Sequence, residues 1–171
     1  MADKPIINID ELQLREFRKG SRYEANLGRI GSLIGMQQLG AQYHVVPPGK
    51  AAFPRHAHHK NEELFVVLGG SGEYQCGDQT WPVRAGDVIA APASDGDAAH
   101  QMRNTGSADL TYLAISTRHD PDVVEYPDSK KFAVASRVPA DKGLLGARVA
   151  YIGRLETSLD YWDGEDIGEE E

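Results

Sequence analysis

Short apolar runs separated by turn residues dominate this sequence from about residue 29 onward. The turns include Pro47-Pro48-Gly49, Gly69-Gly70 and Asn104-Thr105-Gly106. Runs of this length suit β-strands, and no long segment with helical periodicity competes with that interpretation. The pattern predicts an all-β sandwich or barrel built from antiparallel strands. The predicted strands are residues 29–38, 40–46, 64–68, 72–76, 80–84, 88–91, 99–104 and 110–116.

The length of 171 residues suits a single domain. We expect an N-terminal arm over residues 1–28, a barrel over 29–117, and a C-terminal extension with an acidic tail over 118–171. Residues 10–20 predict a short helix or an extended arm, and residues 144–155 predict a further strand or arm. The polar residues that follow 117 are interpreted as an excursion over the surface.

The segment from Leu64 to Leu68 is apolar at every position. Because side chains alternate between the two faces of a strand, both faces of this strand must be covered. One face would line the barrel, and the other would meet a second sheet or a partner subunit. We therefore expect a homodimer.

Charge and cysteine content limit the possible partners and compartment. The formal net charge of −8 opposes nonspecific binding to nucleic acid or to anionic membranes. Residues 160–171 contribute seven carboxylates to that charge. Cys76 is the only cysteine, and the first residues lack the apolar stretch of a signal peptide. We expect a cytoplasmic protein with neither a nucleic-acid nor a membrane partner.

Three histidines and a glutamate form the candidate site. His56 and His58 are two residues apart, so both project from one face of an extended strand. Glu62 follows four residues later, and a bend at Lys60 and Asn61 would bring its carboxylate to the same interior. His100 comes from a separate run, so the four side chains converge only if the sheet curls. Imidazole nitrogens with one carboxylate suit a single divalent ion of Zn, Mn, Fe, Co or Ni.

The sequence resembles the cupin superfamily in two motifs. In the first, His56-x-His58 is followed by Glu62 and, after six residues, by Gly69. The second consists of Gly86, Pro92, His100 and Asn104. The resemblance implies a double-stranded β-helix, the jelly-roll barrel of cupins, with one metal ion held by His56, His58, Glu62 and His100.

Two features depart from the family pattern. Six residues separate Gly49 from His56 where the family has five, and the gap from Pro92 to His100 is three residues longer than usual. The extra residues predict an enlarged rim loop around Asp95-Gly96-Asp97.

Two neighbouring residues compete for ligand roles. His59 could replace His58, but parity with His56 favours His58. Glu63 could replace Glu62, but the spacing to Gly69 favours Glu62, which would leave Glu63 facing outward. His44 and His119 lie outside both motifs and are interpreted as surface or core histidines.

The residues in and around the motifs resemble those of small single-domain bacterial cupins described as sugar-phosphate isomerase-like. This resemblance implies a site for a small polar molecule and leaves three functions open. The chain could be a metal-dependent isomerase or epimerase acting on a sugar or sugar phosphate, an Fe- or Mn-dependent dioxygenase or decarboxylase, or a binding protein without catalysis. The sequence identifies no catalytic base, and a common fold does not decide among these functions.

Overall fold

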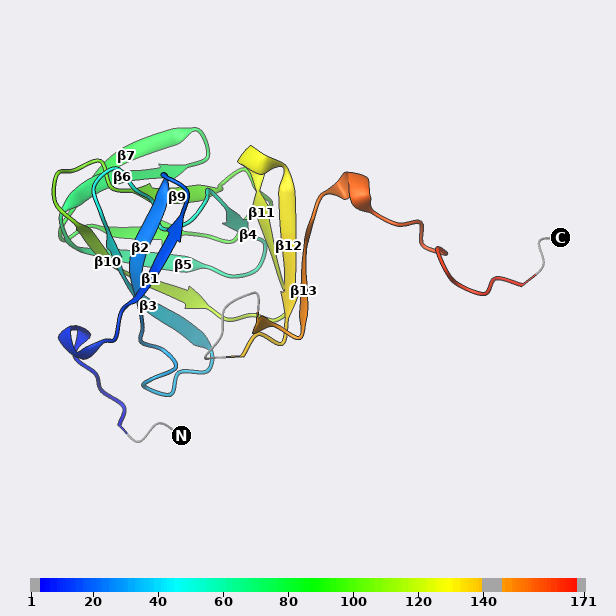
Figure 1. Ribbon diagram of the computed structural model, residues 1–171, viewed down its shortest axis with the longest axis horizontal. Coiled ribbons are helices and arrows are strands. Elements are labelled where there is room, and N and C mark those ends of the chain that lie inside the picture. Colours follow the sequence, from blue (N-terminus) through cyan, green and yellow to red (C-terminus); the bar gives the residue numbers. More distant parts are fainter. Residues whose placement is uncertain (1–3, 140–145, 169–171) are drawn as a thin grey trace.

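The computed structural model describes residues 4–139 and 146–168 and consists almost entirely of antiparallel β-strands (Figure 1). The all-β prediction is therefore confirmed. The strands are β1 (Arg15–Lys19), β2 (Tyr23–Arg29), β3 (Leu39–Val46), β4 (Ala57–His58), β5 (Glu63–Gly69), β6 (Ser71–Cys76), β7 (Gln79–Arg84), β8 (Val88–Ala91), β9 (His100–Arg103), β10 (Leu110–Thr117), β11 (Asp122–Tyr126), β12 (Lys131–Ser136) and β13 (Val149–Gly153). Three short 3-10 turns, η1 (Ile9–Glu11), η2 (Pro127–Ser129) and η4 (Leu155–Thr157), complete the described elements.

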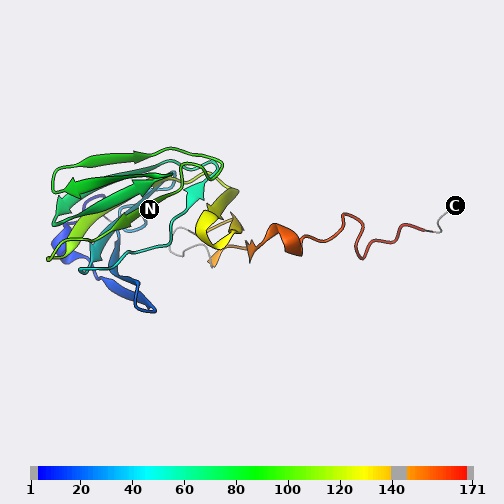
Figure 2. The ribbon, with the colours of Figure 1, turned by 90° about the horizontal axis from the view of Figure 1, so that it is seen from above.

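The described residues form three sheets. The largest has the strand order β1-β2-β3-β10-β5-β8, and a smaller one has the order β7-β6-β9. The third sheet has the order β13-β12-β11-β4 and lies at the side of the barrel from which the C-terminal segment extends (Figures 1 and 2). No helix among the described residues is both long and apolar enough to cross a membrane.

The core lies between the largest sheet and the three-stranded sheet. Buried side chains come from both, among them Phe65 and Tyr112 from the larger sheet and Tyr74 and Met102 from the smaller. Burial alternates along β5. Phe65 and Val67 are buried, whereas Leu64 is 38% exposed and Leu68 is 41% exposed. The uniformly apolar run therefore has one inner and one outer face, as strand geometry requires.

The prediction of a strand over residues 29–38 is wrong. Strand β2 ends at Arg29, and the chain then turns until β3 begins at Leu39. The backbone NH groups of Ile30 and Gly31 both donate to the Ala41 carbonyl, and Gly35 has a φ of +83°. A left-handed glycine and a shared acceptor are features of a turn, and neither allows a regular ladder to continue.

The segments on either side of the predicted barrel also contain strands. Residues 10–20 hold the end of η1 and then β1, which pairs with β2. The segment interpreted as a surface excursion holds β11, which pairs with β4 through Val124 and His58. Residues 1–3 of the predicted arm, residues 140–145 of the predicted extension and residues 169–171 of the acidic tail lie outside the described residues.

Candidate functional site

His56 and His100 are held together by their backbones before their side chains meet. The His56 NH donates to the His100 carbonyl at 3.0 Å, and the His100 NH donates to the His56 carbonyl at 2.8 Å. This isolated bridge links the loop before β4 to the first residue of β9. The two imidazole centroids lie 4.8 Å apart as a result. Residues 44 positions apart in sequence thus contribute to one site.

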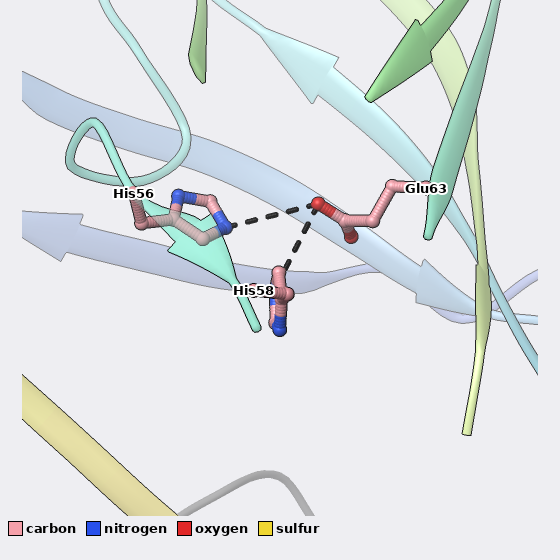
Figure 3. A group of neighbouring side chains, drawn as sticks. All are labelled: His56, His58 and Glu63. Carbon is pink, nitrogen blue, oxygen red and sulfur yellow. Dashed lines mark ion pairs between the residues drawn. The ribbon is translucent and has the colours of Figure 1, made fainter. Parts of the chain in front are cut away.

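The carboxylate that meets the histidines belongs to Glu63, whereas the prediction places Glu62 there. Glu63 Oε2 lies 3.8 Å from the Nε2 atoms of both His56 and His58 (Figure 3). The same oxygen lies 2.9 Å from His100 Nε2. The Glu63 side chain is 16% exposed, whereas Glu62 is an exposed residue. Glu62 shares strand parity with the outward-facing Leu64, and Glu63 shares it with the buried Phe65.

The motif spacing fits Glu63 equally well when it is counted to the next glycine. Six residues separate Glu63 from Gly70, just as six residues separate Glu62 from Gly69. Its φ is +74°, and a Cβ atom there would clash with the Asp109 carbonyl, so the turn after β5 requires glycine at this position. Gly69 has no positive φ. The motif fits the structure when it is counted from Glu63 to Gly70.

Each of the two paired histidines has its Nδ1 atom fixed by an acceptor. His56 Nδ1 donates to the Pro54 carbonyl at 2.8 Å, and His58 Nδ1 donates to Asp122 Oδ2 at 2.6 Å. Because the proton is on Nδ1, the Nε2 lone pair of each ring is available on the side that faces Glu63. His58, and not His59, therefore faces the site. His59 Nε2 instead pairs with Glu125 at the surface.

The sequence interpretation missed Asp122 because its position depends on pairing between distant segments. It begins β11, whose residues Val124 and Glu125 pair with His58 and Ala57 of β4. The side chains of Asp122 and His58 are 64 residues apart in sequence. No spacing rule within the motif could have indicated that contact.

Burial and charge act in opposite directions on the site. Burial lowers the pKa of His56 to about 4, although the Glu63 charge opposes it. Burial also acts to lower the pKa of His58, but the hydrogen bond to Asp122 and the charge of Glu63 outweigh it and raise that pKa. Burial acts to raise the pKa of Glu63, but the hydrogen bond from His100 and the neighbouring histidines hold it at about 2. Glu63 is therefore ionised at neutral pH.

The donor set fits a divalent transition-metal ion. One ligand atom from each of His56, His58 and Glu63 lies within 4.8 Å of the other two. His100 adds a third imidazole beside the same carboxylate. Nitrogen and carboxylate donors of this kind match Mn, Fe, Co, Ni or Zn, whereas Ca would require oxygen ligands throughout.

A cavity of about 680 Å³ opens beside these residues. His44 lines it and is buried, with Nδ1 3.0 Å from the Tyr112 hydroxyl and Nε2 3.1 Å from Gln42 Oε1. His119, Asp120 and two arginines also line the cavity. Its size suits a small organic molecule.

Comparisons with known proteins agree with this architecture. Residues 42–116 match the family model described as a cupin domain. A solved structure described as a sugar phosphate isomerase of the cupin superfamily, from Silicibacter pomeroyi, superposes with a TM-score of 0.75 at 23% identity, over 93% of this chain and 98% of that one. At this identity the likeness concerns the fold.

Two curated relatives match at higher identity over shorter stretches. Auxin-binding protein 1 from Arabidopsis thaliana is 32% identical over 72% of this chain and 65% of its own length. The oxalate-binding protein from Thermotoga maritima is 33% identical over 41% of this chain and 54% of its own length. The alignments therefore span less than two thirds of each of these relatives.

Proposed function

This chain belongs to the cupin superfamily, and on that premise we propose that it holds one divalent metal ion on His56, His58, Glu63 and His100 and binds a small polar molecule in the adjoining cavity. The observation that carries the proposal is the shared orientation of the imidazoles. The Nε2 atoms of all three histidines lie within 3.8 Å of the same Glu63 oxygen. Side chains held by partners on their far side, as His56 and His58 are, need little reorganisation to bind an ion.

His100 has a distinct part in this arrangement. Its Nε2 donates to the ionised Glu63 at 2.9 Å. For that nitrogen to act as a ligand, the ring must present its Nε2 lone pair to the ion, because only an unprotonated imidazole nitrogen coordinates a metal. The His100 side chain is 5% exposed, and its backbone is fixed to His56. The ring is therefore held in place beside Glu63.

As the reaction we propose isomerisation or epimerisation of a sugar or sugar phosphate. A divalent ion supplies Lewis acidity toward neighbouring hydroxyl and carbonyl oxygens. The chain itself provides a cavity whose polar lining includes His44, Gln42 and Asn61. The name of the Silicibacter pomeroyi structure supports this choice of reaction.

A second candidate is binding without catalysis. Both curated relatives are named for a ligand that they bind, auxin in one and oxalate in the other. The same cavity and donor set would hold an oxygen-rich molecule against the ion without converting it. An Fe- or Mn-dependent dioxygenase or decarboxylase is the third possibility that the donor types allow.

Elemental analysis of untagged protein tests the metal proposal. We expect about one divalent ion per chain in the wild type, and loss of that ion in the Glu63→Gln variant and in the double variant His56→Ala, His58→Ala. Glu62→Gln is the matched control, because it makes the same change one residue away on the outer face. Equal metal content in all variants, or loss in Glu62→Gln alone, would contradict the assignment.

A screen of the metal-loaded protein separates the three functions. Interconversion of aldose and ketose phosphates without oxygen supports the isomerase. Oxygen uptake or carbon dioxide release with an organic acid supports the third possibility instead. Saturable ligand binding without turnover across the panel supports the binding protein.

We propose further that the chain is a cytoplasmic homodimer. The single cysteine suits a reducing compartment. The outer face of β5 and β8 supports the dimer, because its apolar side chains are exposed. Leu64 is 38%, Leu68 41% and Val88 65% exposed. Apolar side chains grouped on one sheet face are typical of a surface that a partner covers.

A further inference from the structure

Two arginines line the cavity beside the candidate metal site. Arg29 ends β2, and Arg118 directly follows β10. Both are partly buried. Neither lies in the histidine motifs. We infer that Arg29 and Arg118 form a subsite for the anionic group, a phosphate or a carboxylate, of the molecule that the cavity binds. This inference rests on the proposed function and adds the substrate class to it.

Strand register places both arginines on the inner face of the sheet. Residues directly opposite each other in an antiparallel pair share a face. Ser116 of β10 is opposite Glu63 on one side and Gly40 of β3 on the other. The Arg118 NH donates to the Gln38 carbonyl at 2.9 Å, which extends this ladder by one residue pair. Arg118 therefore has the same parity as Ser116, and it lies two residues, about 7 Å, along the strand from it.

Arg29 reaches the same face from the next strand. It is opposite Gln42 of β3, which bonds to the buried His44. Gln42 and Gly40 are two residues apart, so they also share a face. The two arginines thus lie on either side of β3, on the face that carries Glu63. With strands about 4.8 Å apart, both side chains can reach a ligand that also contacts the candidate metal site.

Gly40 keeps the space between the arginines open. A Cβ atom at this position would lie 2.7 Å from Ser116 Oγ and 3.9 Å from Cγ of Arg118. The aliphatic part of Arg118 therefore packs over the glycine, and no side chain from β3 intervenes at that row. A lining glycine next to a cationic group allows a ligand to approach closely.

The two guanidinium groups differ in their partners from three other arginines of the chain. Arg18, Arg55 and Arg103 each lie within 4.0 Å of a carboxylate, at 3.7, 2.9 and 2.8 Å. Within residues 4–139 and 146–168, neither Arg29 nor Arg118 has such a pair. Among those residues the Arg118 guanidinium donates only to the Val138 carbonyl, at 3.0 Å.

The acidic side chains of the cavity already have partners of their own. Glu63 accepts from His100, Asp122 accepts from His58, and Asp120 accepts from the Ser136 hydroxyl and the Arg137 NH. A partly buried cation without a counter-ion is costly, and an anionic ligand would remove that cost. The planar guanidinium fork fits both phosphate and carboxylate, with two parallel hydrogen bonds to either group.

Titration calorimetry with inorganic phosphate and with acetate tests the subsite. The probes are added to the full-length protein, once loaded with metal and once treated with chelator. We expect at least one probe to bind, and we expect Arg29→Gln or Arg118→Gln to weaken it about tenfold or more. Stronger binding of phosphate than acetate would identify a phosphate ester as the ligand class, and the reverse order a carboxylic acid.

Arg84→Gln is the control, because Arg84 is an exposed arginine on β7 outside the cavity lining. It should leave probe affinity unchanged, and all three variants should keep the wild-type metal content. Unchanged phosphate and acetate affinity in both Arg29→Gln and Arg118→Gln, or no binding of either probe to the wild type, would overturn the subsite. If a probe binds in an arginine-dependent way but the protein takes up no metal under any condition, the subsite is supported and the metal proposal is contradicted.

Discussion

At the scale of single residues, the choice between Glu62 and Glu63 shows what the sequence could predict. The histidines His56, His58 and His100 were identifiable from spacing, and the structure brings all three beside one carboxylate. The neighbouring glutamate was ambiguous because Leu64 to Leu68 is apolar throughout, so no polar alternation marked the inner face. Only the burial of Phe65 resolves the parity.

Asp122→Asn is expected to weaken metal binding about 10- to 100-fold, which is typical for loss of a group that orients a ligand. The asparagine can no longer accept from His58 Nδ1 as a charged group, so the ring loses its fixed orientation. Metal affinity measured by competition with a chelating dye checks this. Glu125→Gln is the matched control, since Glu125 forms the equivalent pair with His59 at 2.7 Å, outside the site. Equal effects of both variants would contradict the role of Asp122.

His44 is expected to make folding stability pH-dependent. Burial lowers its pKa to about 4 from 6.5, although the Glu63 charge opposes this. Between those values the unfolded chain binds a proton that the folded chain does not. Stability therefore falls as pH drops from 6.5 toward 4, by about 1.4 kcal/mol per pH unit from this residue.

Urea unfolding of chelator-treated protein at several pH values measures this slope. The His44→Gln variant should show a slope shallower by about that amount. His56 also has a lowered pKa and contributes in the same direction, so the comparison must be between wild type and variant. Identical slopes in the two proteins would contradict the assignment.

At the scale of elements, turns were more predictable than strand pairing. The Gly69-Gly70 turn was visible in the sequence, and it joins β5 to β6. The pairing of β11 with β4, and of Arg29 with Gln42 across β2 and β3, depends on contacts between separate segments. Composition contains no information about such partners, which explains why Asp122 and the two cavity arginines emerged only from the structure.

Gly70→Ala is expected to destabilise the β5–β6 turn more than Gly49→Ala destabilises its own turn. Both glycines have positive φ values, +74° and +76°, so each alanine costs about 1–2 kcal/mol in backbone strain. A Cβ atom at Gly49 meets nothing within 4 Å, whereas at Gly70 it clashes with the Asp109 carbonyl. The clash adds about 1–3 kcal/mol, which urea unfolding of the two variants would resolve. Equal losses would show that the turn relaxes around the new methyl group.

At the scale of the whole molecule, a single subunit exposes apolar side chains in two places, the outer face of the largest sheet and the long C-terminal segment. The segment after β13 extends away from the barrel (Figures 1 and 2). Its apolar residues are exposed, with Leu155 at 79% and Tyr161 at 84%. The sequence predicted an acidic tail here and a covered second face for Leu64 to Leu68, and the proposed dimer would cover that face.

Val88→Glu is expected to convert the proposed dimer to a monomer, because it places a charge within the apolar outer face of β8. Sedimentation velocity measures the change. Ile6→Glu is the control, since Ile6 is 64% exposed and Val88 65%, but Ile6 lies outside the sheets. A wild-type protein that sediments as a monomer would contradict the dimer proposal. Dissociation of the dimer by both substitutions would contradict the placement of the interface on the outer face of β5 and β8.

The pairing of β4 with β11 has a consequence for the order in which the molecule is made. A growing chain emerges from the ribosome with its N-terminus first, so His56, His58, Glu63 and His100 are all available before Asp122 is synthesised. Until β11 joins β4, no carboxylate holds the Nδ1 side of His58. Selective uptake of the proposed ion is therefore expected late, after the last strands have formed, and an unfinished chain is expected to bind such an ion more weakly than the full-length protein.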